Sequence, residues 1–149
     1  MKIKLVIYLS FFTIGFGQVT TDTQYHGARQ LALSGSDVAW QLDSFSPYHN
    51  PAALVWQKNL IFGISYEQLY GYSFFPHVST AIGFPIKSFG TASVTYENMS
   101  VSYQSQKLTS EQAIGLTHAM FLQRDRNSTL SFGLSVYYLS VDYGSSAGS

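Results

Sequence analysis

The segment at residues 130–138 reads LSFGLSVYY and alternates between large apolar side chains and mostly small ones. A period of two is typical of a β-strand, because successive side chains point to opposite faces of the sheet. Four earlier segments follow the same rule, at residues 60–67, 78–86, 91–97 and 113–122. In each of them one face carries large apolar residues and the other carries mainly Gly, Ser, Thr or Ala. The sequence therefore predicts an all-β chain of about five antiparallel strands joined by hairpins.

The composition narrows the class of β protein. Only 11% of the residues are charged and 16% are aromatic, whereas a soluble domain usually carries about 25% charged residues. The mean hydropathy is +0.05, as expected when strand residues alternate between lipid and lumen. The predicted strands approach the roughly 9–11 residues that a tilted strand needs to cross a bilayer. We therefore expect a transmembrane antiparallel β-barrel, of which these strands form the N-terminal part.

The N-terminus has the features of an export signal. Two lysines near Met1 precede an apolar run at residues 5–16, and GFG at residues 15–17 offers small residues for cleavage before Gln18. The run is shorter than the roughly 20 residues of a membrane anchor, which is the alternative. We expect a signal peptide at residues 1–17, a plug-like segment at 18–57, and strands at 58–149.

Charge and cysteine content exclude several functions. Without the signal peptide the chain keeps 6 Lys and Arg against 8 Asp and Glu, because Lys2 and Lys4 leave with it. It has no basic patch, so nucleic acid is not an expected partner. The absence of cysteine rules out a lipoprotein anchor, a disulfide scaffold and a thiol nucleophile.

The connections between the predicted strands alternate in length. Tight turns are expected at residues 87–90 and 124–128, and longer loops at 70–76 and 103–110. With a periplasmic N-terminus the tight turns would lie on the periplasmic side, as in bacterial outer-membrane barrels. Aromatic residues flank the longer loops and predict an interfacial girdle rather than a sugar-binding patch; they are Tyr66, Tyr70, Tyr72, Phe74, Phe75, Tyr138 and Tyr143.

Glycines recur near the middle of four strands, at Gly63, Gly83, Gly115 and Gly133. Glycine in a strand often marks the close approach of another backbone, which here would be the segment at residues 18–57. The alternative is that these glycines only let the sheet curve. The sequence leaves both interpretations open.

A family resemblance rests on the segment before the strands. GAR at residues 27–29, LALSG at 31–35, DVA at 37–39, Asp43 and NPAAL at 50–54 resemble the opening of PorV/PorQ-type outer-membrane proteins of the FadL-like superfamily. FPIKSFGT at residues 84–91 is similar to the turn after the family's second strand. The resemblance covers roughly residues 27–143, with Ala53 where many relatives have glycine. It implies a structural plug motif of Gly27, Arg29, Gly35, Asn50, Pro51 and Ala52.

The resemblance also implies a function. PorV/PorQ-type proteins serve type IX protein secretion, so the expected location is the bacterial outer membrane and the expected partners are its lipid, secretion components and cargo proteins. A FadL-like channel for fatty acids or hydrocarbons, with a hydrophobic ligand, is the alternative, followed by a small secreted lipid-binding β-protein. Single-chain barrels begin at about 8 strands. The chain is therefore expected to be part of a longer protein, unless strands of several copies close the barrel or the barrel interpretation fails.

No catalytic motif emerges, and we expect neither an enzyme nor a cofactor. SGS at residues 34–36 lacks the full Gly-x-Ser-x-Gly elbow, which leaves a barrel hydrolase as a minor alternative. The four histidines, His26, His49, His77 and His118, are not spaced for a metal site. We expect His118 to mark a local irregularity or to pair with groups of a neighbouring strand. We expect Asn50-Pro51 to be a helix-start or turn element that shapes the plug.

Overall fold

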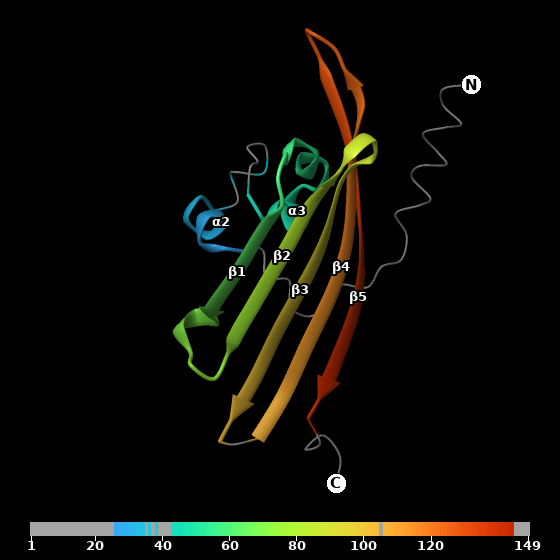
Figure 1. The fold of residues 1–149 in the computed structure, drawn as a ribbon. Helices are drawn as coiled ribbons and strands as arrows, with labels where there is room; N and C mark the ends of the chain where they lie inside the picture. Colours follow the sequence, from blue (N-terminus) through green and yellow to red (C-terminus); the bar gives the residue numbers. More distant parts are fainter. Residues whose placement is uncertain (1–25, 35, 37, 39–42, 105, 145–149) are drawn as a thin grey trace, which may run out of the picture.

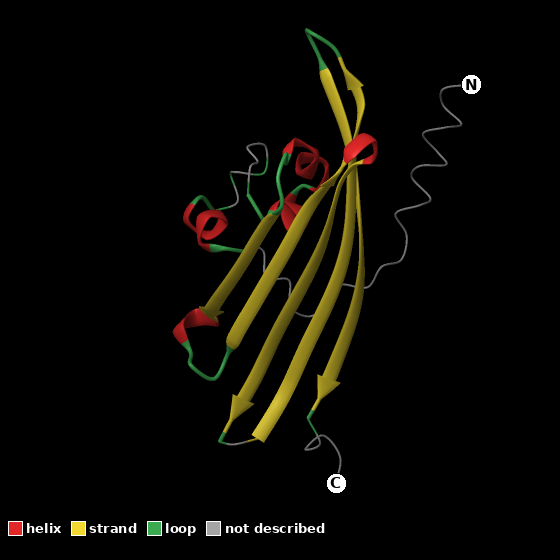
Figure 2. Cartoon of the chain, in the orientation of Figure 1, coloured by secondary structure: helices red, strands yellow, loops and turns green. Residues whose placement is uncertain are grey.

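The computed structural model describes residues 26–144 apart from 35, 37, 39–42 and 105. Five antiparallel strands form one sheet in sequence order (Figures 1 and 2). They are β1 (Ile61–Gln68), β2 (Pro76–Ile86), β3 (Gly90–Tyr103), β4 (Gln106–Arg124) and β5 (Thr129–Tyr143). The prediction of an all-β antiparallel chain is confirmed. The sheet is not closed, since among the described strands β1 and β5 each have one neighbour.

Short helices complete the described chain. The segment before the sheet contains α2 (Ala28–Ala32), α3 (Ser46–His49) and the 3₁₀ helix η1 (Pro51–Trp56). Two more 3₁₀ turns, η2 (Leu69–Gly71) and η3 (Lys87–Phe89), connect β1 to β2 and β2 to β3. No helix in this part of the chain has the length and apolar character needed to cross a membrane.

The two faces of the sheet differ as the alternation predicts. One row across all five strands runs through Phe62, Ile82, Val94, Leu116 and Val136, and these side chains are between 40% and 63% exposed. The adjacent row, from Gly63 through Ala81, Thr95 and Gly115 to Tyr137, lies on the other face. There Ala81 and Thr95 are fully buried. The large apolar side chains thus point away from the rest of the protein.

The connections agree with the prediction at three of four places. Tight turns occur at η3 and at residues 125–128, and a longer aromatic connection joins β1 to β2. The predicted long loop at residues 103–110 is wrong, because β3 and β4 continue as a ladder to the pair Tyr103–Gln106. Residues 104–112 contain a single large apolar side chain, that of Leu108, and so lack apolar alternation, yet backbone hydrogen bonds need no particular side chain. The strands are therefore longer than their hydrophobic pattern.

The segment before β1 lies against the small-residue face of the sheet, on the far side in the view of Figure 1. Its anchor is Leu54 of η1, which is completely buried and forms a small core with Val55 and Ala119. Ile61 of β1 and Phe121 of β4 pack around this core. The segment therefore lies on the face that carries most of the small side chains, with η1 contacting β3, β4 and β5.

The structure confirms the first interpretation, the close approach of the segment, at two of the four glycines. A Cβ added at Gly133 would collide with the backbone of Pro51 and Ala52, and one at Gly63 would collide with Ser44. These two glycines make room for the segment. At Gly115 an added Cβ would instead meet Thr95 and Tyr137 on the neighbouring strands, so that glycine serves packing within the sheet.

Candidate functional site

A cluster of two histidines and two glutamates lies between the segment and the sheet, and we call it the His–Glu cluster: His26, Glu67, His77 and Glu97. Its centre is His77 of β2, whose side chain is only 1% exposed. His77 Nδ1 lies 2.6 Å from Glu67 Oε1 of β1, and His77 Nε2 lies 2.7 Å from Glu97 Oε1 of β3. One imidazole thus joins carboxylates from both neighbouring strands.

The strand register explains this arrangement. His77 stands directly opposite Glu67 in the β1–β2 ladder. In the β2–β3 ladder Glu97 stands opposite Ser79, two residues along β2 from His77. Direct and diagonal cross-strand neighbours on one face lie within reach of long side chains. The antiparallel pairing therefore places both carboxylates beside one ring.

The segment contributes His26 to the cluster. Its ring stacks on Tyr48 of α3, with centroids 3.9 Å apart and planes 5° apart, and it meets the ring of His77 edge-on at 5.8 Å. His26 Nε2 lies 3.2 Å from Glu97 Oε2 but is not aligned for a hydrogen bond. Its buried Nδ1 makes no hydrogen bond to any described residue. The backbone N–H of His26 donates to His49 Nε2 at 3.3 Å.

Tyr48 links α3 to strands β2 and β3 of the sheet by hydrogen bonds, beside the cluster. Its hydroxyl donates toward two backbone carbonyl oxygens, at 2.9 Å to Thr80 and 3.1 Å to Tyr96. Burial raises the pKa of Tyr48 far above its usual value, and the nearby Glu97 carboxylate adds to the shift. The phenol therefore stays neutral and keeps its proton for donation.

Replacing Tyr48 with phenylalanine is expected to weaken the docking of the segment by about 0.5–1.5 kcal/mol, because the hydrogen bonds from the hydroxyl to the Thr80 and Tyr96 carbonyl oxygens are lost. Hydrogen exchange of the α3 and η1 amides would measure this as faster opening. Tyr138→Phe is the matched control, since Tyr138 is exposed on the opposite face. Equal protection in the two variants would contradict the role given to the Tyr48 hydroxyl.

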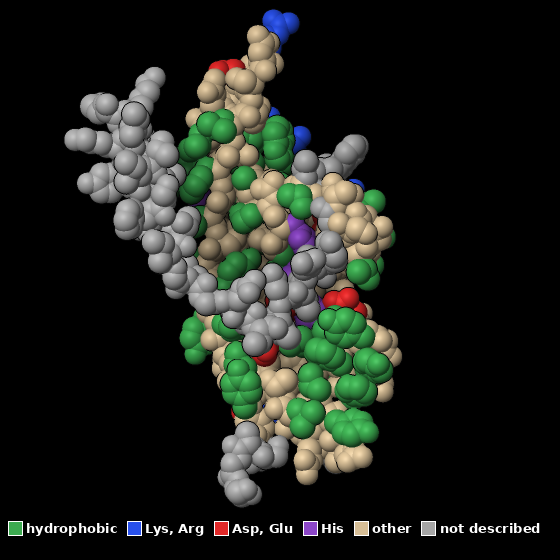
Figure 3. Space-filling model, turned by 180° about the vertical axis from the view of Figure 1, so that it is seen from behind, with side chains coloured by type: hydrophobic (Ala, Val, Ile, Leu, Met, Phe, Trp, Pro, Cys, Tyr) green, Lys and Arg blue, Asp and Glu red, His purple; other side chains and the backbone are tan. Residues whose placement is uncertain are grey.

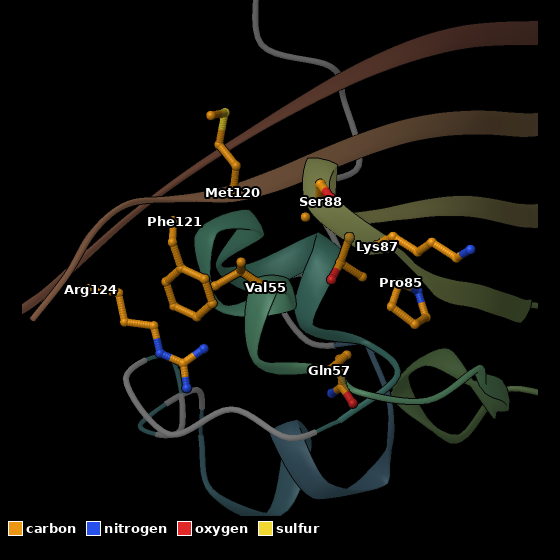
Figure 4. A pocket seen from close by; sticks show the side chains of 10 residues that line it. Val55, Gln57, Pro85, Lys87, Ser88, Met120, Phe121 and Arg124 are labelled. Atoms are coloured by element: carbon orange, nitrogen blue, oxygen red, sulfur yellow. The ribbon is translucent and has the colours of Figure 1, made fainter.

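Apart from the His–Glu cluster, a hollow lies where η1 meets η3 and the end of β4 (Figure 4). Its volume is about 280 Å³, and it has Val55, Lys87, Phe121 and Arg124 among its lining residues. Trp56 meets Phe121 edge-on at 5.1 Å, and the Arg124 guanidinium lies 5.0 Å from the Phe121 ring centre. Pockets for small molecules usually measure about 300–1,000 Å³. This hollow is thus a weaker candidate than the His–Glu cluster.

The predicted plug motif has structural roles at the positions that the structure describes. Gly27 precedes α2 with a φ of 97°, and a Cβ there would lie 2.8 Å from atoms of Gln30 and Phe45. Arg29 is exposed on α2, and Gly35 lies outside the described residues. Asn50 starts η1, because its Oδ1 accepts from the Ala52 N–H at 3.1 Å, and Pro51 follows as the first helical residue. The expected helix start at Asn50-Pro51 is confirmed.

Sequence spacing did not reveal the His–Glu cluster. Three of the four histidines, His26, His49 and His77, converge in space although they lie far apart in the chain. The one sequence feature that pointed to this cluster was the position of Glu67 and Glu97 on the small-residue face of a chain with few charged residues. His118 lies elsewhere, with Nε2 2.7 Å from the carbonyl oxygen of Phe89. The partner of His118 therefore belongs to η3, the turn that leads into the neighbouring strand β3, and not to a strand as expected.

The ligand atoms of His26, His77 and Glu97 all lie within 4.8 Å of one another, a set that could hold a metal ion. No family model, curated protein or solved structure matches this chain. The function must therefore be argued from the geometry of the sheet, the segment and the cluster.

Proposed function

We propose that the chain forms part of an outer-membrane β-barrel whose lumen is occupied by its own N-terminal segment, and that it acts as a binding and scaffolding component of type IX protein secretion, like PorV/PorQ-type proteins. The observation that carries the proposal is the orientation of the sheet. Its large apolar side chains face outward over all five strands, while its small and polar side chains face the segment. Water penalises this orientation and lipid favours it.

Aromatic residues at one end of the sheet support a membrane position. Tyr72 stacks on Phe74 with centroids 4.9 Å apart, and Phe74 meets Tyr103 edge-on at 5.7 Å. Tyr70 is 86% exposed at the same end. Hydrophobic side chains gather there in the view from behind, at the lower right of Figure 3. Aromatic rings of this kind settle at the boundary between lipid and water.

A membrane position requires that the edges of the sheet be paired, because an unpaired backbone group in lipid costs several kcal/mol. Additional strands, from a longer chain or from other copies, would have to join β1 and β5. The mass of the native assembly extracted from membranes, compared with the mass of the denatured chain, would distinguish the two ways of closing the barrel.

The polarity of the covered face favours a scaffold over a channel for hydrophobic solutes. This face carries Ser79, Ser93, Thr117 and the His–Glu cluster, whereas a path for fatty acids or hydrocarbons needs an apolar lining. The segment is also held by direct bonds: Tyr137 of β5 donates to the Pro47 carbonyl oxygen at 3.2 Å. A segment fixed in this way would occlude the lumen and leave binding to the outer loops.

Deletion of the gene in the source bacterium tests the proposal. We expect the protein in the outer-membrane fraction, with a mature chain that begins at Gln18, and we expect the deletion to retain secreted cargo inside the cell until the wild-type gene is restored. Normal export of cargo in the deletion strain would refute the secretion role. Loss of fatty-acid uptake with normal export would favour the FadL-like alternative, and recovery of the protein in the soluble fraction would refute the membrane location.

A further inference from the structure

We propose that His26, His77 and Glu97 bind a divalent transition-metal ion, with zinc as the best match, and that this ion clamps the N-terminal segment to β2 and β3. The three residues come from three separate parts of the fold. His26 precedes α2, His77 lies near the start of β2, and Glu97 lies in β3. This inference concerns how the segment is held and does not depend on the secretion role.

The donor set suits zinc. Two imidazole nitrogens and one carboxylate are ligands of this borderline-soft ion, which binds them at about 2.0–2.2 Å. Calcium and magnesium prefer all-oxygen sites. Tetrahedral ligands at such bond lengths lie about 3.3 Å apart, while here Nε2 of His77 and of His26 lie 2.7 and 3.2 Å from oxygens of Glu97. All three ligand atoms lie within 4.8 Å of one another, so side-chain shifts of at most about 1.5 Å would bring them to the spacing that zinc requires.

Glu67 orients His77 for this role. The Nδ1–H of His77 can donate to Glu67 Oε1 at 2.6 Å, which leaves the lone pair of Nε2 directed at Glu97. A carboxylate behind a ligating histidine is the usual second partner in zinc sites. Because a lone pair and a carboxylate oxygen repel each other at 2.7 Å, the space between them calls for a positive centre, which is either a second ring proton or a metal ion.

His26 distinguishes these two cases. The residue is only 8% exposed, and neither ring nitrogen makes a hydrogen bond within the described part of the chain. Glu97 Oε2 lies 3.2 Å from His26 Nε2 but is not aligned for a hydrogen bond, and burying a polar group without a hydrogen bond is costly. A proton on His77 would leave His26 in this state. An ion bound by Glu97, His77 and His26 Nε2 would supply the missing partner, with water completing a four-coordinate site.

The test uses the full-length protein, purified from membranes in detergent, stripped with a chelator and dialysed. Zinc is titrated by calorimetry, and Co²⁺ is used as a probe whose visible absorption reports four-coordinate geometry. We expect one zinc per chain and the Co²⁺ bands in the wild type. His26→Ala is expected to weaken zinc binding at least 10-fold, and Glu67→Gln about 10-fold, the range found for outer partners of metal ligands.

Matched controls keep the result interpretable. His118→Ala removes a histidine on the opposite face and should leave zinc binding unchanged. His26 lies outside the sheet, so His26→Ala should not prevent the strands from assembling. A digestion readout adds a structural measure: zinc should slow proteolysis of the segment in the wild type and not in His26→Ala. No zinc binding by the wild type, or equal binding by wild type and His26→Ala, would overturn the proposal.

Discussion

Replacing Leu116 with arginine is expected to destabilise the protein in a lipid bilayer by about 2–4 kcal/mol, the cost of a charge on the lipid face at mid-depth. Leu116 lies in the middle of β4 between Val94 and Val136, and it is 61% exposed. In a membrane its surroundings would be hydrocarbon, which cannot solvate a guanidinium. Denaturant unfolding in vesicles would measure the loss, and the amount recovered from outer membranes should fall as well.

Leu108→Arg provides the matched control on the same strand. Leu108 is also exposed but lies near the end of β4, close to the pair Tyr103–Gln106. A charge near the interface costs only about 0–1 kcal/mol. In a water-soluble protein both exposed leucines would tolerate arginine within about 0.5 kcal/mol. Equal, small effects of the two substitutions would therefore contradict the membrane position of this face.

Replacing Leu54 with alanine is expected to reduce the free energy of docking of the segment by about 2–5 kcal/mol, the usual cost of truncating a buried leucine. Leu54 has no exposed surface, and among the described residues the core around it contains only Val55 and Ala119 as further buried members. So few neighbours cannot easily collapse into the cavity. The segment should open more often, which limited proteolysis and hydrogen exchange of η1 would detect.

Leu54→Met separates the effect of the cavity from the effect of the changed side chain. Methionine conserves most of the volume, and such exchanges usually cost less than about 1.5 kcal/mol. Proteolysis of Leu54→Met should therefore resemble that of the wild type. If Leu54→Ala were no more sensitive to protease than Leu54→Met, the segment would not depend on this core for its position.

The strands were predictable because their signal is local. Alternation in Leu130 to Tyr138 and in the four other runs follows from the geometry of an extended backbone, in which neighbouring side chains point in opposite directions. The same rule placed the small residues on one face and the large apolar residues on the other. The prediction failed for residues 103–110, where a backbone ladder continues through polar residues that carry no periodic signal.

The candidate site was not predictable in the same way. The plug motif led to Asn50 and Pro51, which start a helix and are not members of the cluster. The chemistry lies instead at His77, whose partners are 10 and 20 residues away in the chain. No short spacing connects these residues. Only the fact that Glu67 and Glu97 fall on the small-residue face hinted that this face carries polar chemistry.

The sequence by itself determined the strands, the direction of each face and the tight turns, because these depend on local backbone geometry and on the alternation of apolar and small or polar side chains. Tertiary structure alone decided which side chains meet. The register of two ladders puts Glu67 and Glu97 beside His77, and the docking of Leu54 accompanies the placement of His26 against them. Register and docking are set cooperatively by many weak contacts across the sheet, so no short stretch of sequence contains them.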